Sequence, residues 1–495
     1  MNRARTAAPQ FELPPTAVSS AGEYFVPPRA AYTTYIPAIL ILTGLPAWIA
    51  GNDLAMALAA AVGGVTALYM LWDWLFEEGP TRISTVMAMT LLLGYGLGAL
   101  NTWLTLPRGG LTVAQFLGGD ESVYAHGMAA VLLVTGPLCF VGEFFERPLF
   151  GSEFRLPLDY RTYAFIVLGT GAVVAGFLTH NLEFQGLQMK AGQQLSPAAS
   201  LLSSAFPPLT ALAVAVCLVA RGRVIKPLII LCTFILCILI MAVGRRSMIY
   251  TAMLVIFALR LTGFKIRRAF LKKILLMAGL GFFLAVGVSV FMLLRLAGFQ
   301  TGKGLNTTLA ERIQIALTWV EDGTALNRAT EANRVNFQGR TFVLGFFADV
   351  LDGSMRRTPA LGKLAMGFAS QAIPRVFNPN KDLTFGEEPL VDAQFGLTYA
   401  DAANSILSNG ATDFGIFGIL LYPLLLVFVL RVLMTGFAMV LPPMPLAFIA
   451  LALLFTVLQT ETTLVSYFAL IRDVLIYGSI LYIFARLPRL SLRNQ

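Results

Sequence analysis

Residues 274–294 read ILLMAGLGFFLAVGVSVFMLL, a run of apolar and small residues without a single charge. An uninterrupted run of this length is typical of a helix that crosses a bilayer. It is followed by residues 295–411, a mostly polar stretch with eleven Lys or Arg and eleven Asp or Glu side chains. Apolar runs recur along the chain whereas a long polar stretch occurs once. The pattern predicts membrane helices arranged around one large loop.

Composition supports the same fold class. Of the 495 residues, 57% are hydrophobic and only 13% are charged. We expect an all-α polytopic membrane protein with about twelve transmembrane helices, because no soluble core needs so much apolar surface. The expected helices span residues 35–50, 54–76, 83–104, 124–144, 163–178, 201–220, 227–243, 248–261, 274–294, 414–433, 446–458 and 464–486.

Charge in the short loops predicts the orientation. Basic residues concentrate in every second short loop, and such loops face the cytoplasm. Both termini are then cytoplasmic and the large loop is external. The predicted parts are a tail (1–34), nine helices (35–294), the loop (295–411), three helices (412–486) and a second tail (487–495). Inside the loop, residues 309–319, 342–351 and 361–373 are apolar pieces too short to span, so we expect interfacial or re-entrant segments.

Several functional classes are disfavoured. The net charge of +9 is concentrated in short loops, as membrane topology requires, so nucleic acid is a poor partner. The four cysteines all lie in apolar runs without ligand-like spacing, which indicates neither a metal site nor a disulfide framework. No Walker, dinucleotide-binding or HExxH motif is present, so a soluble nucleotide or zinc enzyme is not supported.

The motif Gly244-Arg245-Arg246-Ser247 is the first candidate site. It lies in the external turn between two predicted helices, where two arginines oppose the charge bias. Guanidinium groups beside unpaired N–H groups at a helix start could bind a diphosphate. Alternatively, both arginines snorkel to anionic lipid headgroups.

Two basic segments of the loop are further candidates for anion binding. Residues 327–340 contain Arg328, Arg334 and Arg340, and Glu331 lies three residues from both Arg328 and Arg334. A helix would pair Glu331 with these two arginines on one face, although a solvated charged face explains the same pattern. In residues 372–381, prolines hold turns that present Arg375 and Lys381.

Titratable groups elsewhere include acids, a histidine and a pair inside the last predicted helix. Acidic residues follow the Lys381 turn, among them Asp392, and His180 lies near the external end of a helix. A carboxylate or imidazole could deprotonate a sugar hydroxyl, although exposed acids are usually solubilising and a lone histidine is usually bonded to a carbonyl. Arg472 and Asp473 form a fold-stabilising pair or part of a phosphate groove.

Residues 403–418 (ANSILSNGATDFGIFG) lead into the tenth predicted helix. Thr412 or Asp413 is expected to be its N-cap, because short oxygen-bearing side chains accept hydrogen bonds from the first helical N–H groups. Gly410 and Gly418 allow close backbone packing. A structural role explains this segment.

These motifs together resemble the O-antigen polymerase (Wzy-type) family of oligosaccharide repeat-unit polymerases. The likeness rests on Gly244-Arg245-Arg246-Ser247, on Ile373-Pro374-Arg375 with Lys381, and on residues 405–418, in this order around one external loop. It covers roughly residues 225–480. The resemblance implies a fold similar to the GT-C type and a bacterial inner-membrane location.

The resemblance also implies a reaction. A glycan would pass from one undecaprenyl-diphosphate carrier to a repeat unit on another at the periplasmic face, without metal or nucleotide cofactor. A chain-length regulator protein is a further expected partner beside the lipid bilayer. Arg245, Arg246 and Arg375 would neutralise the departing diphosphate, and Asp392, Glu331 and His180 are, in that order, the candidate general bases.

Two other functions fit the same sequence. A ligase of the same broad superfamily differs only in its acceptor, which the sequence does not specify. A transporter or flippase would move the lipid-linked unit without chemistry, and it predicts charges lining a path through many spans. Here the charge is dense in the loop and sparse inside the predicted helices, which favours an enzyme.

Overall fold

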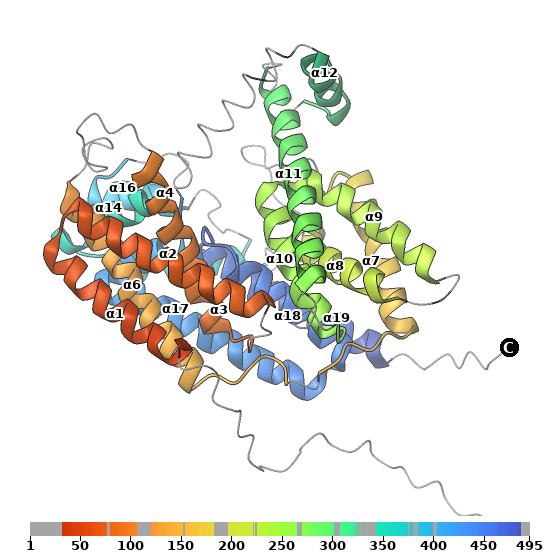
Figure 1. Ribbon diagram of the computed structural model, residues 1–495, viewed down its shortest axis with the longest axis horizontal. Helices are drawn as coiled ribbons and strands as arrows, with labels where there is room; N and C mark the ends of the chain where they lie inside the picture. Colours follow the sequence, from red (N-terminus) through yellow and green to blue (C-terminus); the bar gives the residue numbers. More distant parts are fainter. Residues whose placement is uncertain are drawn as a thin grey trace, which may run out of the picture.

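The computed structural model places most of the chain and identifies it as helical. It describes residues 32–76, 80–105, 120–151, 154–182, 197–220, 222, 225–264, 270–300, 307–321, 323, 327, 343–374, 377–379, 385–398 and 403–486. Within these ranges the regular elements are helices, and no strand occurs. Figure 1 shows two groups of helices with the C-terminal helices between them.

The first group contains the N-terminal helices, which pack around α6. Its members are α1 (Tyr32–Ala50), α2 (Asp53–Phe76), α3 (Ile83–Leu91), the π-helix η1 (Leu92–Leu97), α4 (Gly98–Thr105) and α6 (Glu121–Phe144). Helix α6 contacts α1, α2 and α3, and η1 packs on α2. Because α6 has neighbours on most sides, it is apolar along nearly its whole length and largely buried.

The second group is formed by the five helices that follow. They are α7 (Tyr160–Leu178), α8 (Pro197–Val219), α9 (Ile225–Val243), α10 (Arg245–Leu261) and α11 (Phe270–Gln300). Helix α8 lies at the centre and contacts α7, α9 and α10. Helix α12 (Leu309–Glu321) packs against α11 near its far end, where Figure 1 shows it projecting from the bundle.

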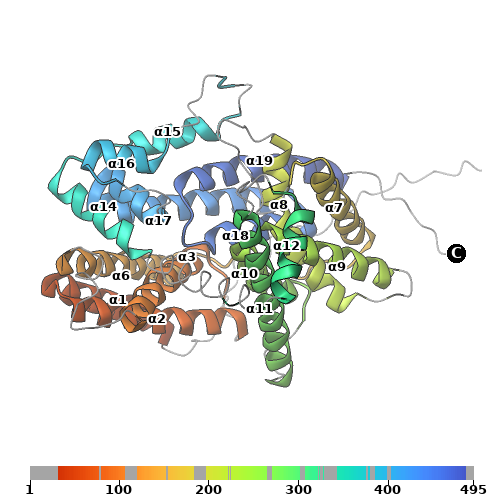
Figure 2. The same cartoon turned by 90° about the horizontal axis from the view of Figure 1, so that it is seen from above.

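The last three helices join the two groups. Helix α17 (Ile406–Val440) packs against α3 and α6, whereas α18 (Pro443–Val457) contacts α3 on one side and α8 and α10 on the other. Helix α19 (Leu464–Arg486) packs on α18 and α8. The view in Figure 2 shows the same central position of these helices.

Three short helices of the predicted loop pack on this framework. They are α14 (Leu344–Arg356), α15 (Lys363–Ala372) and α16 (Glu387–Phe395). Helix α14 buries Phe346, Phe347 and Leu351 against α6 and α17, and α15 lies against α19. The short apolar pieces expected here are therefore helices, and their apolar faces contact the bundle.

The helices confirm a membrane protein. Nine helices in the described ranges are long and apolar enough to cross a bilayer. The other three predicted spans are also helical but shorter, in α1, α10 and α18. The total of twelve spans, the division of the chain into five parts and the direction in which the helices cross remain predictions.

The start of α17 differs from expectation. Its N-cap is Ser405, whose hydroxyl accepts from Leu407 N and Ser408 N, so the prediction of Thr412 or Asp413 as the cap was wrong. The helix instead kinks at Phe414 and Gly415, where Gly415 has a φ of 58°. Close packing at the glycines is confirmed, because a Cβ on Gly410 would collide with the Gly418 carbonyl group.

Candidate functional site

The arginine motif begins α10 as predicted. Gly244 alone separates α9 from α10, and its φ of 145° lies in a region that side chains disfavour. Arg246 lies in the first helical turn, and its Nη2 atom is 2.5 Å from Oε2 of Glu461. The two side chains are 39% and 20% exposed. Both side chains are therefore accessible, so another anion can reach Arg246 and compete with Glu461 for it.

Glu461 lies in the short connection between α18 and α19. Hydrogen bonds fix this connection before and after Glu461. Thr460 Oγ1 donates to the Thr90 carbonyl at 3.0 Å, and Leu464 N donates to Asn409 Oδ1 at 2.6 Å. Thr90 lies seven residues after the start of the continuous helix formed by α3, η1 and α4, which is long and apolar enough to cross a bilayer. The connection therefore packs against the side of a candidate membrane helix and not beyond its end.

Non-helical backbone at membrane depth is found where it is enclosed by protein or lines a water-filled cavity. Thr460 and Thr462 are buried, whereas Glu461 and Arg246 both retain exposed area. The arrangement is a polar, accessible spot where α10 begins beside the connection between α18 and α19.

A buried polar cluster lies behind the ion pair. Glu387, the first residue of α16, is only 2% exposed. Its Oε2 atom accepts from Asn409 Nδ2 at 2.6 Å, and its Oε1 atom lies 3.3 Å from Thr412 Oγ1. Burial raises the pKa of Glu387 to about 8, although hydrogen bonds from Ser408, Asn409 and Thr412 favour the charged form; the Glu388 carboxylate adds a smaller upward effect.

The hydrogen bonds fit a neutral Glu387. The Thr412 hydroxyl also donates to the Ser408 carbonyl at 2.9 Å, and one hydroxyl has one proton to donate. A protonated Glu387 can donate to Thr412 Oγ1 while accepting from Asn409. Asn409 thus connects α16 with the Glu461 connection, because its Oδ1 atom accepts from Leu464 N.

Tyr95 brings the π-helix into the same cluster. Its hydroxyl lies 2.5 Å from Ser405 Oγ, and both residues are fully buried. π-Helical turns occur frequently at functional sites, since the extra residue redirects a side chain. Beside Ser405, the buried Asn404 Oδ1 atom has no hydrogen-bond partner among the described residues.

Asp413 fixes helix α15 beside the cluster. Its two carboxylate oxygens accept from Leu364 N and Ala365 N, each at 2.9 Å, and Tyr422 donates to Oδ2 at 2.6 Å. A carboxylate at the start of a helix satisfies unpaired N–H groups and interacts favourably with the helix dipole. Asp413 therefore caps α15 rather than its own helix.

The predicted pair in α19 forms and belongs to a wider network. Arg472 Nη2 is 2.7 Å from Asp473 Oδ1, and Arg472 also donates to the Ala372 carbonyl at the end of α15 and to Ser200 Oγ of α8. Asp473 accepts in turn from Ser204 at 2.9 Å. The network joins three helices, which is the fold-stabilising role considered for this pair.

The other predicted site residues are less closely associated. Arg245 is the half-buried first residue of α10. Asp392 is exposed and accepts from Thr398 at 3.1 Å, and His180 is exposed just after α7 with a φ of 58°. The remaining predicted residues lie outside the described ranges: Glu331, Arg334, Arg340, Arg375 and Lys381.

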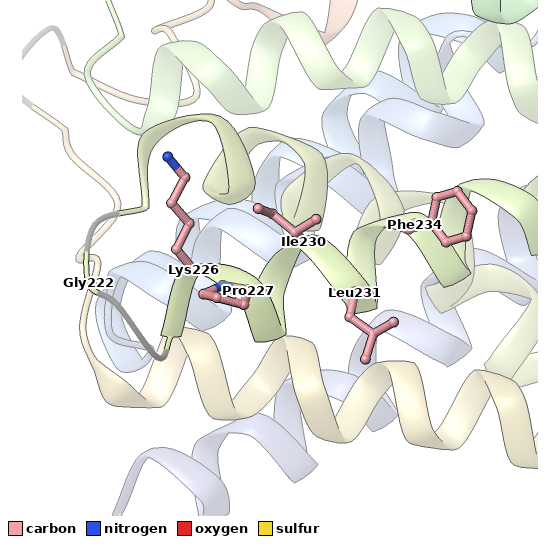
Figure 3. Close-up of a pocket in the computed structure, with 6 residues that line it drawn as sticks. All are labelled: Gly222, Lys226, Pro227, Ile230, Leu231 and Phe234. Atoms are coloured by element: carbon pink, nitrogen blue, oxygen red, sulfur yellow. The ribbon is translucent and has the colours of Figure 1, made fainter.

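An apolar groove lies away from this site. Figure 3 shows it along α9, lined by Gly222, Lys226, Pro227, Ile230, Leu231 and Phe234. None of the predicted site residues lines it. With one lysine among apolar side chains on a weakly buried helix, the groove is a lipid-facing surface rather than a place for acid–base chemistry.

Sequence reasoning missed Glu461 and Asn409. Glu461 sits in a short polar connection between two apolar runs, and its partner Arg246 is 215 residues away. The signal that could have found Glu461 is its position: it is a carboxylate in the few residues between two predicted membrane helices, 446–458 and 464–486. Comparisons of the chain with protein-family models, curated proteins and solved structures found no match.

Proposed function

We propose that this membrane protein is a glycosyltransferase that uses a lipid-linked donor. It transfers glycan from one undecaprenyl-diphosphate carrier to a repeat unit on another carrier, at the periplasmic face of the bacterial inner membrane. The product is a surface polysaccharide. The helices would form a GT-C-like fold with both termini in the cytoplasm, and residues 295–411 would close over the reacting end of the substrate.

The observation that carries the proposal is the position of Arg246. Its guanidinium is partly exposed at the start of α10, and its ion-pair partner among the described residues is the accessible Glu461. A diphosphate offers several anionic oxygens that match the guanidinium donors, whereas Glu461 offers one carboxylate. A ligand with a phosphorylated head and a long apolar tail fits a cationic spot reached through the membrane.

Electrostatic stabilisation of the leaving group is the chemistry proposed for this spot. Negative charge grows on the diphosphate as the glycosidic bond breaks, and Arg245 and Arg246 would neutralise it. We assign the same binding role to four further residues of the external segment: Arg334, Arg340, Arg375 and Lys381. The isoprenoid tail would lie along apolar helix surfaces such as the α9 groove.

Surface glycan length in a deletion strain tests the proposal. A polymerase predicts surface glycan of a single repeat unit, and complementation with the intact gene restores long chains. Long chains retained on the lipid carrier would indicate a ligase, and units accumulating on the cytoplasmic leaflet would indicate a flippase.

Arginine variants test the site in the same strain. Arg246→Ala should leave single-unit glycan while the protein still inserts in the membrane. The matched control is Arg356→Ala, since this arginine of α14 is 68% exposed and its ion-pair partner within the described part of the chain is Asp352, four residues away. Full-length polymer from the Arg246 variant would refute the assignment of the diphosphate site.

A further inference from the structure

We propose that Glu461 is the general base that activates the acceptor hydroxyl, and that donor binding releases it from Arg246. This inference rests on the proposed function, whose reaction needs a group to take a proton from the acceptor. The carboxylate of Glu461 is held 2.5 Å from the guanidinium expected to bind the donor diphosphate. In a displacement at the anomeric carbon, the acceptor hydroxyl and the departing diphosphate lie close together. A base that contacts the diphosphate-binding guanidinium is therefore within reach of the acceptor.

Position and access favour Glu461 over the other carboxylates near the site. Glu387 is sealed from solvent and bonded to Asn409 and Thr412. Asp413 is fully occupied by the α15 N–H groups and Tyr422. Glu461 instead keeps a fifth of its side chain exposed. A substrate hydroxyl can reach it.

The connection around Glu461 is rigid, which suits a base that must meet a hydroxyl at a fixed distance. Thr460 is bonded to the Thr90 carbonyl and packs against Gly94, where a Cβ would collide with its side chain. Leu464 N is bonded to Asn409. General bases act within hydrogen-bond reach of the proton they take, so a fixed backbone beside one movable carboxylate is a productive arrangement.

Donor binding would switch the carboxylate on. Paired with Arg246, the Glu461 carboxylate has an oxygen directed at the guanidinium and away from an acceptor hydroxyl. The diphosphate carries more charge than a carboxylate and takes over the guanidinium. Glu461 then becomes available only when a donor is in place.

The step balances as follows. The acceptor hydroxyl oxygen forms a bond to the anomeric carbon of the donor sugar, and its proton moves to a Glu461 oxygen. The bond between that carbon and the diphosphate oxygen breaks with its electron pair. Undecaprenyl diphosphate leaves with one more negative charge, which Arg246 neutralises. The neutral Glu461 returns its proton to water when the site opens.

Purified protein in nanodiscs tests the inference with two probes. Undecaprenyl diphosphate alone measures binding, and lipid-linked saccharides extracted from the deletion strain measure elongation. For Glu461→Gln we expect undecaprenyl diphosphate to bind as in the native protein or several-fold tighter, because Arg246 loses its competitor. Elongation should fall by about 100-fold or more, the range for loss of a general base.

Two further variants keep the outcome interpretable. Glu461→Asp retains a carboxylate and should elongate faster than the Gln variant, with the pH–rate limb of the base preserved. Glu143→Gln removes the partly exposed carboxylate of α6 that pairs with Arg82, and this variant should match the native protein. Thermal melting in the nanodisc verifies that each variant is folded.

The failures of the two proposals differ. If Arg246→Ala loses binding of undecaprenyl diphosphate but Glu461→Gln elongates within about threefold of the native rate, Glu461 is only a counterion and the inference is wrong. Equal rates for the Asp and Gln variants overturn it as well. If the native protein neither binds undecaprenyl diphosphate nor elongates the extracted saccharides, the proposed function itself is wrong.

Discussion

The docking of α16 onto α17 is expected to weaken as the pH rises, because Glu387 is buried in its neutral form. The pKa of this carboxyl is raised from 4.5 to about 8 by burial. When α16 detaches, Glu387 enters water and recovers its ordinary pKa. Between these two values the docked state holds a proton that the detached state releases, so each pH increment favours detachment.

The magnitude follows from the size of the shift. One pKa unit corresponds to about 1.4 kcal/mol, so docking should weaken by roughly 3 kcal/mol between pH 6 and pH 8. Below pH 4.5 both states are protonated and above about pH 8 both are ionised, so the dependence is flat outside this window. The contribution of neutral Glu387 to the docking of α16 is therefore complete below pH 4.5 and is lost as the pH rises to about 8.

Amide hydrogen exchange of the α16 peptide measures the docking. Native protein and Glu387→Gln are compared at each pH, because the intrinsic exchange rate changes with pH equally in both. Gln keeps the bond from Asn409 but has no ionisable proton, so its protection relative to the native protein should rise steadily from pH 6 to pH 8. A constant ratio across this range, or native protection that increases with pH, would refute the reasoning.

Two further predictions concern α17. Gly410→Ala should lower the melting temperature of the detergent-solubilised protein, because a Cβ there collides with the Gly418 carbonyl. Such overpacking typically costs about 1–3 kcal/mol of folding free energy. The control Gly436→Ala, in the same helix, places its Cβ in open space and should leave the melting temperature unchanged. Asp413→Asn should weaken the cap of α15 by about 1 kcal/mol, seen as faster amide exchange at residues 363–366 with α14 unchanged. Equal melting of the two glycine variants, or unaltered exchange in α15, would contradict these accounts.

Most of the framework could be predicted from the sequence because apolar length alone determines where membrane helices lie. The start of α10 could also be predicted, because Gly244, Arg245 and Arg246 interrupt an otherwise apolar stretch at a single point. The expected short pieces of the loop are helices for the same reason, as their apolar residues recur at helical spacing.

The contacts between distant segments could not be predicted in this way. The nonapeptide of α16 begins with two glutamates and has the composition of a solvated helix, yet packing against α17 buries Glu387 and leaves Asp392 exposed. Asp413 has the local signature of a cap for its own helix. Its actual partner, α15, starts about fifty residues earlier in the chain, and only the tertiary fold brings the two together.

The π-helix η1 contains one residue more per turn than an α-helix, and this extra residue sets the rotation of α4, which follows it directly. Each residue of an α-helix turns the chain by about 100°, and a π turn accommodates one more residue than an α turn. Trp103, in α4, donates to Asp53 Oδ2 at 3.1 Å across the neighbouring helix. Deleting one residue between Leu92 and Leu97 would rewind the segment and rotate that indole away from its carboxylate. The number of residues in η1 therefore determines which way the side chains of α4 face, and a substitution that keeps this number cannot have the same effect.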